Sequence, residues 1–437
     1  MQSIRADNLI AALLFAASIL YSPPSAALQP LEAFVAGARR QNPDALEATA
    51  NLSQQQAQAD SSLGAVLPGV SARGSYTRNQ YSSTIDVGLP KPVTIVPTDQ
   101  WDGSATLRVP LIDLAGFRRV AAAKTTAGAA ARQLDATRLQ VEGQVAQDYY
   151  QVVANLALVS AAETALEVSR EGLRLAQARH DAGTAAGLEV DRARADVEQQ
   201  FQQLAAAQLS VQLQARALQS ASGVEPDVST VAPLTDDLHA ERELHAFESG
   251  LTALPSVAAA ATATRAAEEQ AVAQRLALAP SIAGTFTERG TNAPGFTGHE
   301  WSYQAALVAT WSFDLTNIAG IRAQDAAADA ARAREIRAVL AAGDAIHREW
   351  NTVVAGIARS RSARVGREAA NHAATQARDR YRAGTITQLD LLQAQRDAFS
   401  AEVSRIQADA DLVNARAQLR LSSGLSLLTD NGTKGTP

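Results

Sequence analysis

The stretch RHDAGTAAGLEVDRARADV at residues 179–197 occurs a second time, in altered form, as RYRAGTITQLDLLQAQRDA at residues 380–398. The two stretches align without a gap at a single offset of 201 residues. The positions that carry the same or a chemically similar residue include Arg179 and Arg380, Gly183 and Gly384, Thr184 and Thr385, Leu188 and Leu389, Glu189 and Asp390, Asp196 and Asp397. An ordered series of this kind indicates an internal repeat, and a repeat has to be recognised before the fold can be interpreted.

Further matches extend the repeat toward the N-terminus of each half. They are Trp101 with Trp301, Pro43 with Pro255, and Pro68 with Pro280. The chain is therefore a tandem duplication, and we divide its 437 residues into five parts. These are a signal peptide at 1–27, a first repeat at 28–223, a linker with a short equatorial segment at 224–254, a second repeat at 255–424 and a disordered tail at 425–437.

The N-terminus contains an apolar run of 13 residues, 9–21, followed by small residues at Ser25 and Ala27. A membrane-spanning helix needs ~20 apolar residues. The run and the small residues are typical of a signal peptide that is cleaved near Ala27. A short buried helix is the alternative. No other stretch resembles a spanning helix, so we expect any membrane insertion to depend on strands.

Composition argues against several classes of function. The net charge is −6 with acidic and basic residues interspersed, which disfavours nucleic acid as a ligand. The chain contains no cysteine, which excludes disulfides and thiolate metal sites. Its six histidines are scattered, and no HExxH, GxSxG or phosphate-loop motif occurs. We therefore expect no enzyme activity, no metal and no cofactor.

Each half contains two segments in which apolar and polar residues alternate, at residues 70–76 and 105–111 and again at 282–286 and 301–313. In 301–313 one face is apolar with aromatics at both ends, as in a strand of a transmembrane barrel. A half-buried strand of a soluble sandwich alternates in the same way. For the barrel, the aromatics expected at the membrane interfaces are Tyr76, Trp101, Trp301, Tyr303 and Trp311. The proline-rich segment 80–100 would then be an external loop.

Two segments, 116–181 and 320–382, contain no proline and no cluster of turn residues. A continuous helix of this length would extend ~95 Å. A second helix is expected after each glycine turn, because apolar residues repeat at intervals of seven, as in a coiled coil. These residues are Val190, Val197, Leu204, Val211 and Leu218 in the first half, and Leu392, Phe399, Ile406 and Val413 in the second. The sequence thus predicts two long antiparallel helical hairpins.

Four strands in one chain cannot close a transmembrane barrel, because the smallest such barrels have eight. An open sheet edge in lipid would leave backbone groups unpaired, at a cost of several kcal/mol for each group. We therefore expect several copies of the chain to contribute strands to one shared barrel, with the helical hairpins assembled into a tube.

The order of these elements, together with the motif Tyr381-Arg382-Ala383-Gly384-Thr385 and the following Leu389-Asp390, resembles the outer-membrane efflux protein family that includes TolC. The resemblance covers residues from about 31 to 424. It implies an α+β membrane protein, a homotrimer with a periplasmic α-barrel and a shared β-barrel of twelve strands. It also implies export across the outer membrane, with a periplasmic adaptor protein and an inner-membrane transporter as partners.

The resemblance further assigns roles to residues at the helix turns. Glu189 and Asp390 would form the periplasmic gate, although acidic residues there also favour the first turn of a helix through its dipole. Two positions depart from the family pattern, since Ile386 and Gln393 replace residues that help to lock the gate. Residues expected at the hairpin tips, where an adaptor docks, are Arg179, Gly183, Thr184, Leu188, Arg380, Tyr381, Gly384, Thr385 and Leu389.

A different class of protein also fits the helical pattern. A secreted, trimeric coiled coil with a structural or adhesive role would contain the same heptad repeats. The alternating segments distinguish the two interpretations, because a stalk has no need for strands with one aromatic-rich and one polar face. We therefore expect an outer-membrane channel subunit.

Overall fold

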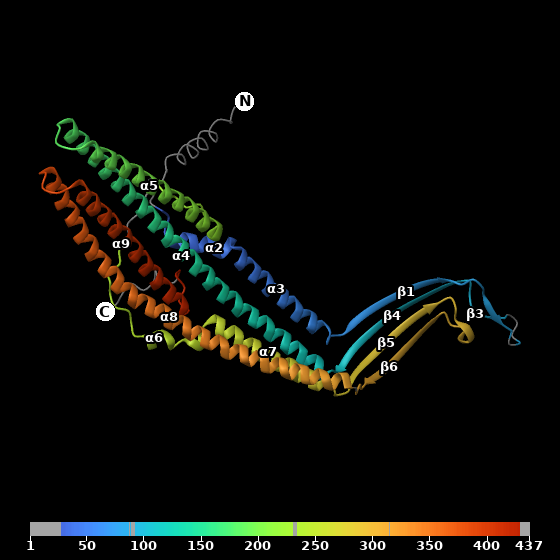
Figure 1. Ribbon diagram of the computed structural model, residues 1–437. Helices are drawn as coiled ribbons and strands as arrows, with labels where there is room; N and C mark the ends of the chain where they lie inside the picture. Colours follow the sequence, from blue (N-terminus) through green and yellow to red (C-terminus); the bar gives the residue numbers. More distant parts are fainter. Residues whose placement is uncertain (1–27, 87, 89–91, 230–233, 314, 429–437) are drawn as a thin grey trace, which may run out of the picture. The chain divides into compact units, whose positions relative to one another are not determined.

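The computed structural model describes residues 28–86, 88, 92–229, 234–313 and 315–428, so the expected signal peptide lies outside the described residues. Both halves contain a helix, two long strands, a long helix and a return helix in the same order (Figure 1), and the first half has two short extra strands, β2 (Ser83–Ile85) and β3 (Val93–Val96). The elements of the first half are α2 (Leu31–Gln41), α3 (Pro43–Gly64), β1 (Gly69–Arg78), β2 (Ser83–Ile85), β3 (Val93–Val96), β4 (Asp99–Ile112), α4 (Leu114–Asp181) and α5 (Gly187–Ser222). Those of the linker and second half are α6 (Leu244–Glu248), η1 (Leu251–Ala253), α7 (Pro255–Leu276), β5 (Ser281–Thr291), η2 (Gly295–Thr297), β6 (Trp301–Thr310), α8 (Leu315–Arg382) and α9 (Gln388–Ser422).

The chain forms two compact units, each built from segments of both repeats. Unit 1 comprises Met1–Leu46, Arg138–Gly250 and Asp344–Pro437, and its described part contains the helix turns. Unit 2 comprises Glu47–Thr137 and Leu251–Gly343 and contains all the strands named above. The duplicated halves are therefore interleaved in both units and do not form separate domains.

The main sheet of unit 2 is antiparallel, with the strand order β1-β4-β5-β6. The two repeats meet at the central pair, β4 and β5, whereas β1 and β6 are the edge strands (Figure 1). The pairing places Val70 opposite Leu107, Leu107 opposite Phe286, and Phe286 opposite Ala305. Because side chains alternate along a strand, this register aligns most of the large apolar residues of the four strands on one side.

The sheet consequently has two contrasting faces. The apolar face carries Val70, Ala72, Tyr76, Trp101, Ala105, Leu107, Phe286, Tyr303, Ala305 and Leu307, together with the charged Glu288 between Ala105 and Tyr303 and the pair Arg78 and Asp99 at one end. The polar face carries Ser71, Arg73, Ser75, Asp102, Ser104, Thr106, Arg108, Thr285, Thr287, Arg289, Ser302 and Gln304. On the polar face Thr106 and Thr287 are joined through their hydroxyls at 3.1 Å. The apolar residues remain uncovered, with Val70 77% and Leu307 71% exposed, which is unusual for a face of this size unless another phase or chain covers it.

Two details of the strands differ from the sequence analysis. The expected loop at 80–100 contains a second, two-stranded sheet in which β2 pairs with β3, because β-branched residues on both arms can pair. The strand expected to reach residue 313 ends at Thr310, since α8 begins at Leu315. Trp311 therefore lies just beyond β6, where its indole Nε1 donates to the carbonyl of Leu278 at 3.0 Å.

The long helices are as expected: α4 and α8 each have 68 residues. The return helices α5 and α9 end at Ser222 and Ser422, and Gly223 and Gly424 then adopt positive φ angles of 71° and 86°. None of the nine predicted heptad residues is exposed, whereas Phe201, Leu209 and Leu213 elsewhere on α5 are more than half exposed. The sevenfold spacing therefore correctly identified the packed side of each return helix.

The core of unit 1 lies where α2 packs against α4 and α5. Phe34, Val145, Val152 and Leu218 are completely buried there, among other apolar residues. An 18-residue window of α4 has a mean hydropathy of 1.4, high enough for a spanning helix by composition alone, which the sequence analysis did not expect. Part of α4 packs in this core through its valines, so the apolar character of the helix has a structural reason.

A buried carboxylate, that of Glu142 on α4, binds α2 and the segment that follows α9. Arg39 of α2 donates to it through Nε at 2.8 Å, and Ser426 donates through Oγ at 2.9 Å. Glu142 is 0% exposed, so these partners replace water around its charge. The expected disordered tail began at 425, but Ser426 and Leu427 are bound here, and residues 429–437 lie outside the described residues.

Candidate functional site at the helix turns

The two turns between the long and return helices have the same hydrogen bonds, as their repeated sequence predicts. Gly183 and Gly384 have φ angles of 73° and 74°, in the left-handed region that favours glycine. The carbonyl of Arg179 accepts from both the amide and the hydroxyl of Thr184, each at 2.9 Å. Arg380 and Thr385 repeat this arrangement at 2.9 and 3.0 Å. The spacing Arg-x-x-x-Gly-Thr therefore closes each helix at a fixed residue.

Tyr381, in the last turn of α8, connects the two hairpins. Its side chain is almost completely buried, since the residue is only 2% exposed. Its hydroxyl donates to Glu189 Oε2 on α5 at 2.8 Å. Arg179 of α4 lies over its ring, with the guanidinium carbon 4.6 Å from the ring centre, and donates to its carbonyl at 3.2 Å. One tyrosine therefore binds both helices of the other hairpin.

Burial raises the pKa of Tyr381, and its hydrogen bond to the Glu189 carboxylate raises it further, while Arg179 acts in the opposite direction. The phenol is therefore protonated at neutral pH and able to donate. Gln388, at the start of α9, adds a second link, because its Nε2 donates to the carbonyl of Glu189 at 2.5 Å. The Gln388 Oε1 atom is buried without a hydrogen-bond partner.

Asp390 occupies the position that corresponds to Glu189 but makes different contacts. It belongs to a capping box at the start of α9, in which Thr387 Oγ1 accepts from the amide of Asp390, and Asp390 Oδ2 accepts from the amide of Thr387 at 3.0 Å. The hydrogen bonds from Thr387 lower the pKa of Asp390. The carboxylate is exposed and ionised at neutral pH. Asp390 therefore favours the first turn of α9 through the helix dipole, as the sequence allowed.

Two ion pairs also join the hairpins. Arg382 of α8 lies 2.9 Å from Glu171 of α4, and Arg396 of α9 lies 3.4 Å from the buried Asp196 of α5. The two positions that depart from the family pattern take no part in these pairs. Ile386 is half-buried, and Gln393 donates to Asp397 on its own helix at 2.9 Å.

The predicted tip residues and the predicted gate residue Glu189 thus differ in their surroundings. Arg179, Tyr381 and Glu189 come together and join the hairpins. Leu188 and Leu389 are 58% and 60% exposed, so they are accessible to a neighbouring chain. Gln388 was missed by the sequence analysis, because its counterpart in the first repeat is Gly187 and the comparison of repeats gave no signal.

The predicted interface aromatics lie at the ends of the strands. Tyr76 is paired with Trp101, and Trp301 is the first residue of β6, so these three lie toward the same end of the sheet. The ring of Trp301 covers Gly290, where a Cβ atom would come within 3.0 Å of it. Tyr303 stacks on Phe286, with ring centres 6.0 Å apart, and Trp311 lies beyond the other end of β6. All five predicted aromatics are exposed.

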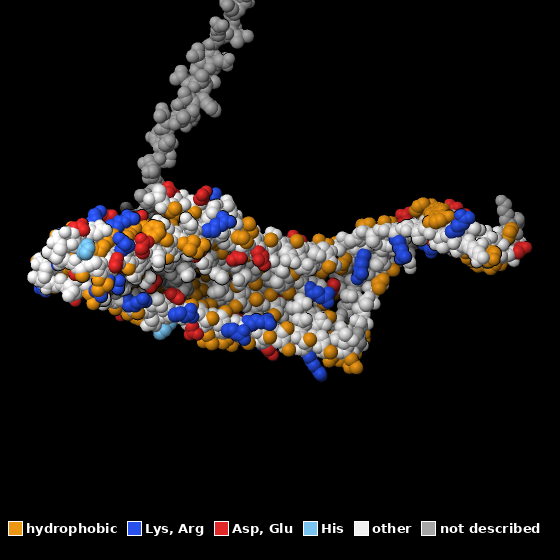
Figure 2. All heavy atoms as spheres, turned by 45° about the horizontal axis from the view of Figure 1, so that its top comes forward, with side chains coloured by type: hydrophobic (Ala, Val, Ile, Leu, Met, Phe, Trp, Pro, Cys, Tyr) orange, Lys and Arg blue, Asp and Glu red, His pale blue; other side chains and the backbone are white. Residues whose placement is uncertain are grey.

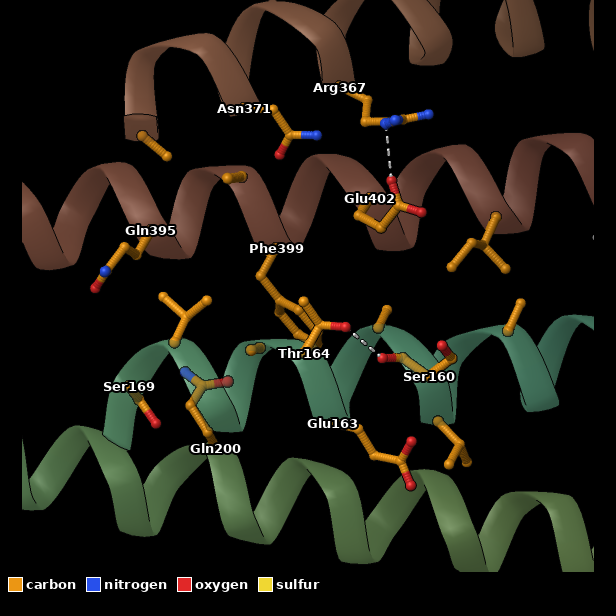
Figure 3. A pocket seen from close by; sticks show the side chains of 18 of the residues that line it. Ser160, Glu163, Thr164, Ser169, Gln200, Arg367, Asn371, Gln395, Phe399 and Glu402 are labelled. Atoms are coloured by element: carbon orange, nitrogen blue, oxygen red, sulfur yellow. Dashed lines mark hydrogen bonds and ion pairs between the residues drawn. The ribbon is translucent and has the colours of Figure 1, made fainter. Parts of the chain in front are cut away.

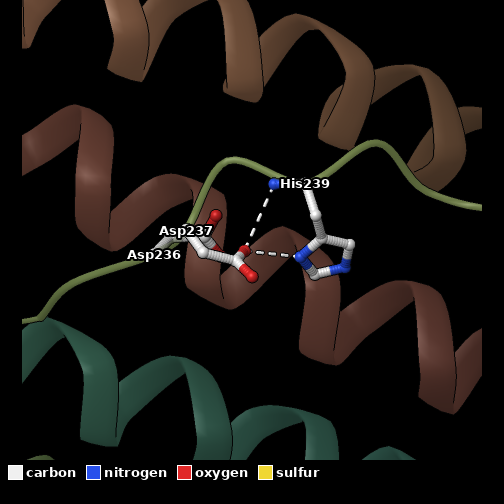
Figure 4. A group of neighbouring side chains, drawn as sticks. All are labelled: Asp236, Asp237 and His239. Carbon is white, nitrogen blue, oxygen red and sulfur yellow. Dashed lines mark hydrogen bonds and ion pairs between the residues drawn. The ribbon is translucent and has the colours of Figure 1, made fainter.

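Among the described residues, one group could offer three ligands to a metal ion: Asp236, Asp237 and His239 (Figure 4). These side chains already have partners within the chain. Asp236 pairs with Arg416 of α9 at 2.8 Å, and His239 Nδ1 lies 2.5 Å from Asp237. The His239 hydrogen bonds lower the pKa of Asp237. The group therefore fastens the linker segment to α9 through Arg416, which also pairs with Glu241.

A cavity of about 970 Å³ lies within unit 1, lined by α4, α5, α8 and α9 (Figure 3). Figure 3 shows Phe399 of α9 extending toward α4, with Arg367 and Glu402 paired at 3.1 Å at one side. Gln200 of α5 also lines the cavity, and its Oε1 atom has no partner. The lining mixes apolar, amide, hydroxyl and charged groups.

Long helical hairpins attached in sequence to a four-stranded sheet with one uncovered apolar face define the class of TolC-like outer-membrane proteins. The outer membrane efflux protein family model matches residues 35–224 and 250–425. This chain belongs to that family, whose members are outer-membrane channel proteins and not enzymes. The assignment confirms the resemblance and the fold class predicted from the sequence.

Individual proteins of known name or structure are also similar to this chain. The fusaric acid resistance protein FusA of Burkholderia cepacia is 28% identical over 199 residues, which is 45% of this chain and 37% of that protein. The alignment therefore spans little more than a third of this relative. A membrane protein from Pseudomonas aeruginosa shares the fold with a TM-score of 0.79, at 21% identity over 91% of this chain and 90% of that one. The CmeC outer membrane channel of Campylobacter jejuni gives 0.78, at 17% identity over 91% and 86%.

Proposed function

We propose that this chain is the outer-membrane channel subunit of a tripartite efflux or type I secretion system. One observation carries the proposal: a largely apolar face, with Glu288 as a charged residue within it, extends across all four paired strands, while β1 and β6 are left as sheet edges. In lipid, such edges must pair with other strands. Three copies would supply twelve strands, enough for a closed barrel with the apolar face toward lipid and the polar face toward water.

The helices offer a surface for the same assembly. Phe201, Leu209 and Leu213 of α5 are 54%, 55% and 65% exposed, and Val365 of α8 is 64% exposed. In a trimer these residues would pack against the neighbouring subunit, and their burial would stabilise it by about 25 cal/mol for each Å² removed from water. The secreted coiled-coil alternative also predicts this surface, but it gives no role to the apolar face of the sheet.

The helix turns would form the periplasmic gate of this channel. In the closed form, Tyr381 and Arg179 hold the second hairpin to the first, and Glu189 accepts the tyrosine hydroxyl. Opening would separate these groups. Asp390, whose carboxylate is exposed, would supply the ring of negative charge at the constriction and attract cations there. Substrates would arrive from an inner-membrane transporter through a periplasmic adaptor that docks on the exposed tips at Leu188 and Leu389.

The proposal can be tested by isolating the full chain from the outer-membrane fraction. An oligomer of three subunits that resists detergent at low temperature and dissociates on heating is the expected result, together with discrete conductance steps in planar lipid bilayers. A monomer found in the soluble periplasmic or extracellular fraction would contradict the proposal and support the coiled-coil alternative.

A further inference from the structure

The polar face of the four-stranded sheet carries more positive than negative charge. Arg73 of β1, Arg108 of β4 and Arg289 of β5 lie on this face, because their partners in the register are Ser104, Thr285 and Ser302. Asp102 is the one acidic residue on this face within the four paired strands, all of which the structure describes in full. It pairs with Arg289 at 2.7 Å. Arg73 and Arg108 therefore leave two uncompensated positive charges.

These two arginines are free to meet a solute. Both are exposed, and within the described residues neither makes an ion pair. Arg73 lies opposite Ser104, and Arg108 lies four residues farther along β4, which is ~14 Å at the rise of an extended strand. Figure 2 shows Lys and Arg side chains spaced along the strands. The charges of Arg73 and Arg108 thus lie at two different positions along the strands, on the same face of the sheet.

We propose that Arg73 and Arg108 make the strand-lined part of the pore selective for anions, so that the exported solutes carry carboxylate or phosphate groups. The inference rests on the proposed function, in which the polar face lines a water-filled pore. In the trimer each residue on that face occurs three times and forms a ring around the pore. Rings of arginine are a device of anion-conducting pores. The guanidinium group also binds carboxylates and phosphates through two parallel hydrogen bonds.

The strength of this effect follows from the geometry. Exposed charges act over a Debye length of ~8 Å at physiological ionic strength, so rings ~14 Å apart form successive, partly overlapping attractive sites. A water-filled channel lined by one sign of charge and walled by lipid-embedded protein raises the local concentration of counterions by about tenfold or more. The acidic residues at the helix turns, Glu189 and Asp390, act separately and are unchanged in the variants below.

The test uses the full-length trimer in planar bilayers, with inorganic tripolyphosphate as the probe, added to the side that the external loops face. The natural protein should be blocked in a voltage-dependent manner. The Arg73→Gln/Arg108→Gln double variant should need a concentration about tenfold higher. Arg78→Gln is the matched control, because Arg78 is on the same strand but on the opposite face, and its block should equal that of the natural protein. Arg73→Lys/Arg108→Lys, which keeps both charges, should retain most of the block.

The outcomes distinguish the inference from the function on which it depends. A double variant that conducts and is blocked at the same concentration as the natural protein overturns the anion filter but leaves the channel proposal intact. Equal weakening of block by Arg78→Gln also overturns it, since the effect would then not depend on the face. A natural protein that forms no channel at all overturns both.

Discussion

The hydroxyl of Tyr381 donates a 2.8 Å hydrogen bond to the carboxylate of Glu189, a residue 192 positions earlier in the chain. The bond joins the end of the second long helix to the start of the first return helix. Arg179, in the other arm of the first hairpin, covers the ring of the same tyrosine. Separation of the two hairpins therefore requires this contact to break.

Replacing Tyr381 with phenylalanine should favour the open channel. The variant keeps the ring beneath Arg179 but removes the hydrogen bond, which contributes about 1 kcal/mol in each subunit, or about a fivefold change in the closed-to-open ratio. Single-channel recordings should show longer openings. Tyr303→Phe, the same change on an exposed tyrosine of the sheet, should leave gating unaltered. Unchanged open times in Tyr381→Phe would show that the bond does not restrain the gate.

Removing both acidic groups at the turns, Glu189→Ala with Asp390→Ala, should raise single-channel conductance and weaken block by multivalent cations such as hexamminecobalt. The reason is the loss of the negative ring at the constriction. Because Asp390 also caps α9, Thr387→Ala is the matched control: it breaks the capping box and keeps the charge. If Thr387→Ala alone reproduces the loss of block, the cap and not the charge is responsible.

The pH dependence of this block should follow Asp390. Its pKa is lowered from the usual 3.8 by hydrogen bonds from Thr387. A carboxyl group whose folded pKa is lowered stays charged and contributes stability above its ordinary pKa, and both are lost only as the pH falls through the folded value. Cation block should therefore persist from pH 7 down through the ordinary carboxyl pKa of 3.8 and be lost only in more acidic solution. Asp390→Asn should show weak block across the same range, and a loss of block near pH 6 would contradict the assignment.

Neighbouring residues of β6 provide a test of the two faces of the sheet. Leu307→Arg would place a charge on the apolar face, at a cost of about 2–4 kcal/mol near the middle of a bilayer. Ala306→Arg makes the same addition on the polar face, where water can solvate it. The first variant should sharply reduce the heat-resistant trimer in outer-membrane fractions, and the second should not. Equal assembly of both would argue against a lipid-facing apolar side.

The buried Glu142 should be important for stability and not for transport. Glu142→Gln leaves the guanidinium of Arg39, which is 37% exposed, without its charged partner, and the loss of hydrogen bonds to a charged group costs about 1.5–3 kcal/mol. We expect a lower temperature of trimer dissociation with unchanged conductance in the surviving channels. Glu163→Gln, on the exposed side of the same helix, serves as the control. A dissociation temperature equal to that of the natural protein would show that Ser426 and water suffice.

The sequence by itself determined the elements and their order. The sevenfold spacing of residues such as Leu218 and Ile406 and the alternation around Leu307 are local patterns, and each is set by the geometry of one helix or one strand. The match between Gly183 and Gly384 located both turns for the same reason, since a left-handed residue is a local requirement. The acidic residues at those turns were also visible, but their contacts were not.

Only the tertiary structure decided which partners those residues have. Glu189 and Asp390 align in sequence, yet Glu189 binds Tyr381 while Asp390 caps its own helix. Gln388 also binds the carbonyl of Glu189, although the aligned residue of the first repeat, Gly187, has no side chain that could do so. The pairing of β4 with β5 joins the strands of the two repeats into one sheet and also links residues from different repeats. Contacts of this kind depend on how distant segments pack. The two repeats therefore form the same helices and strands, but corresponding residues contact different neighbours.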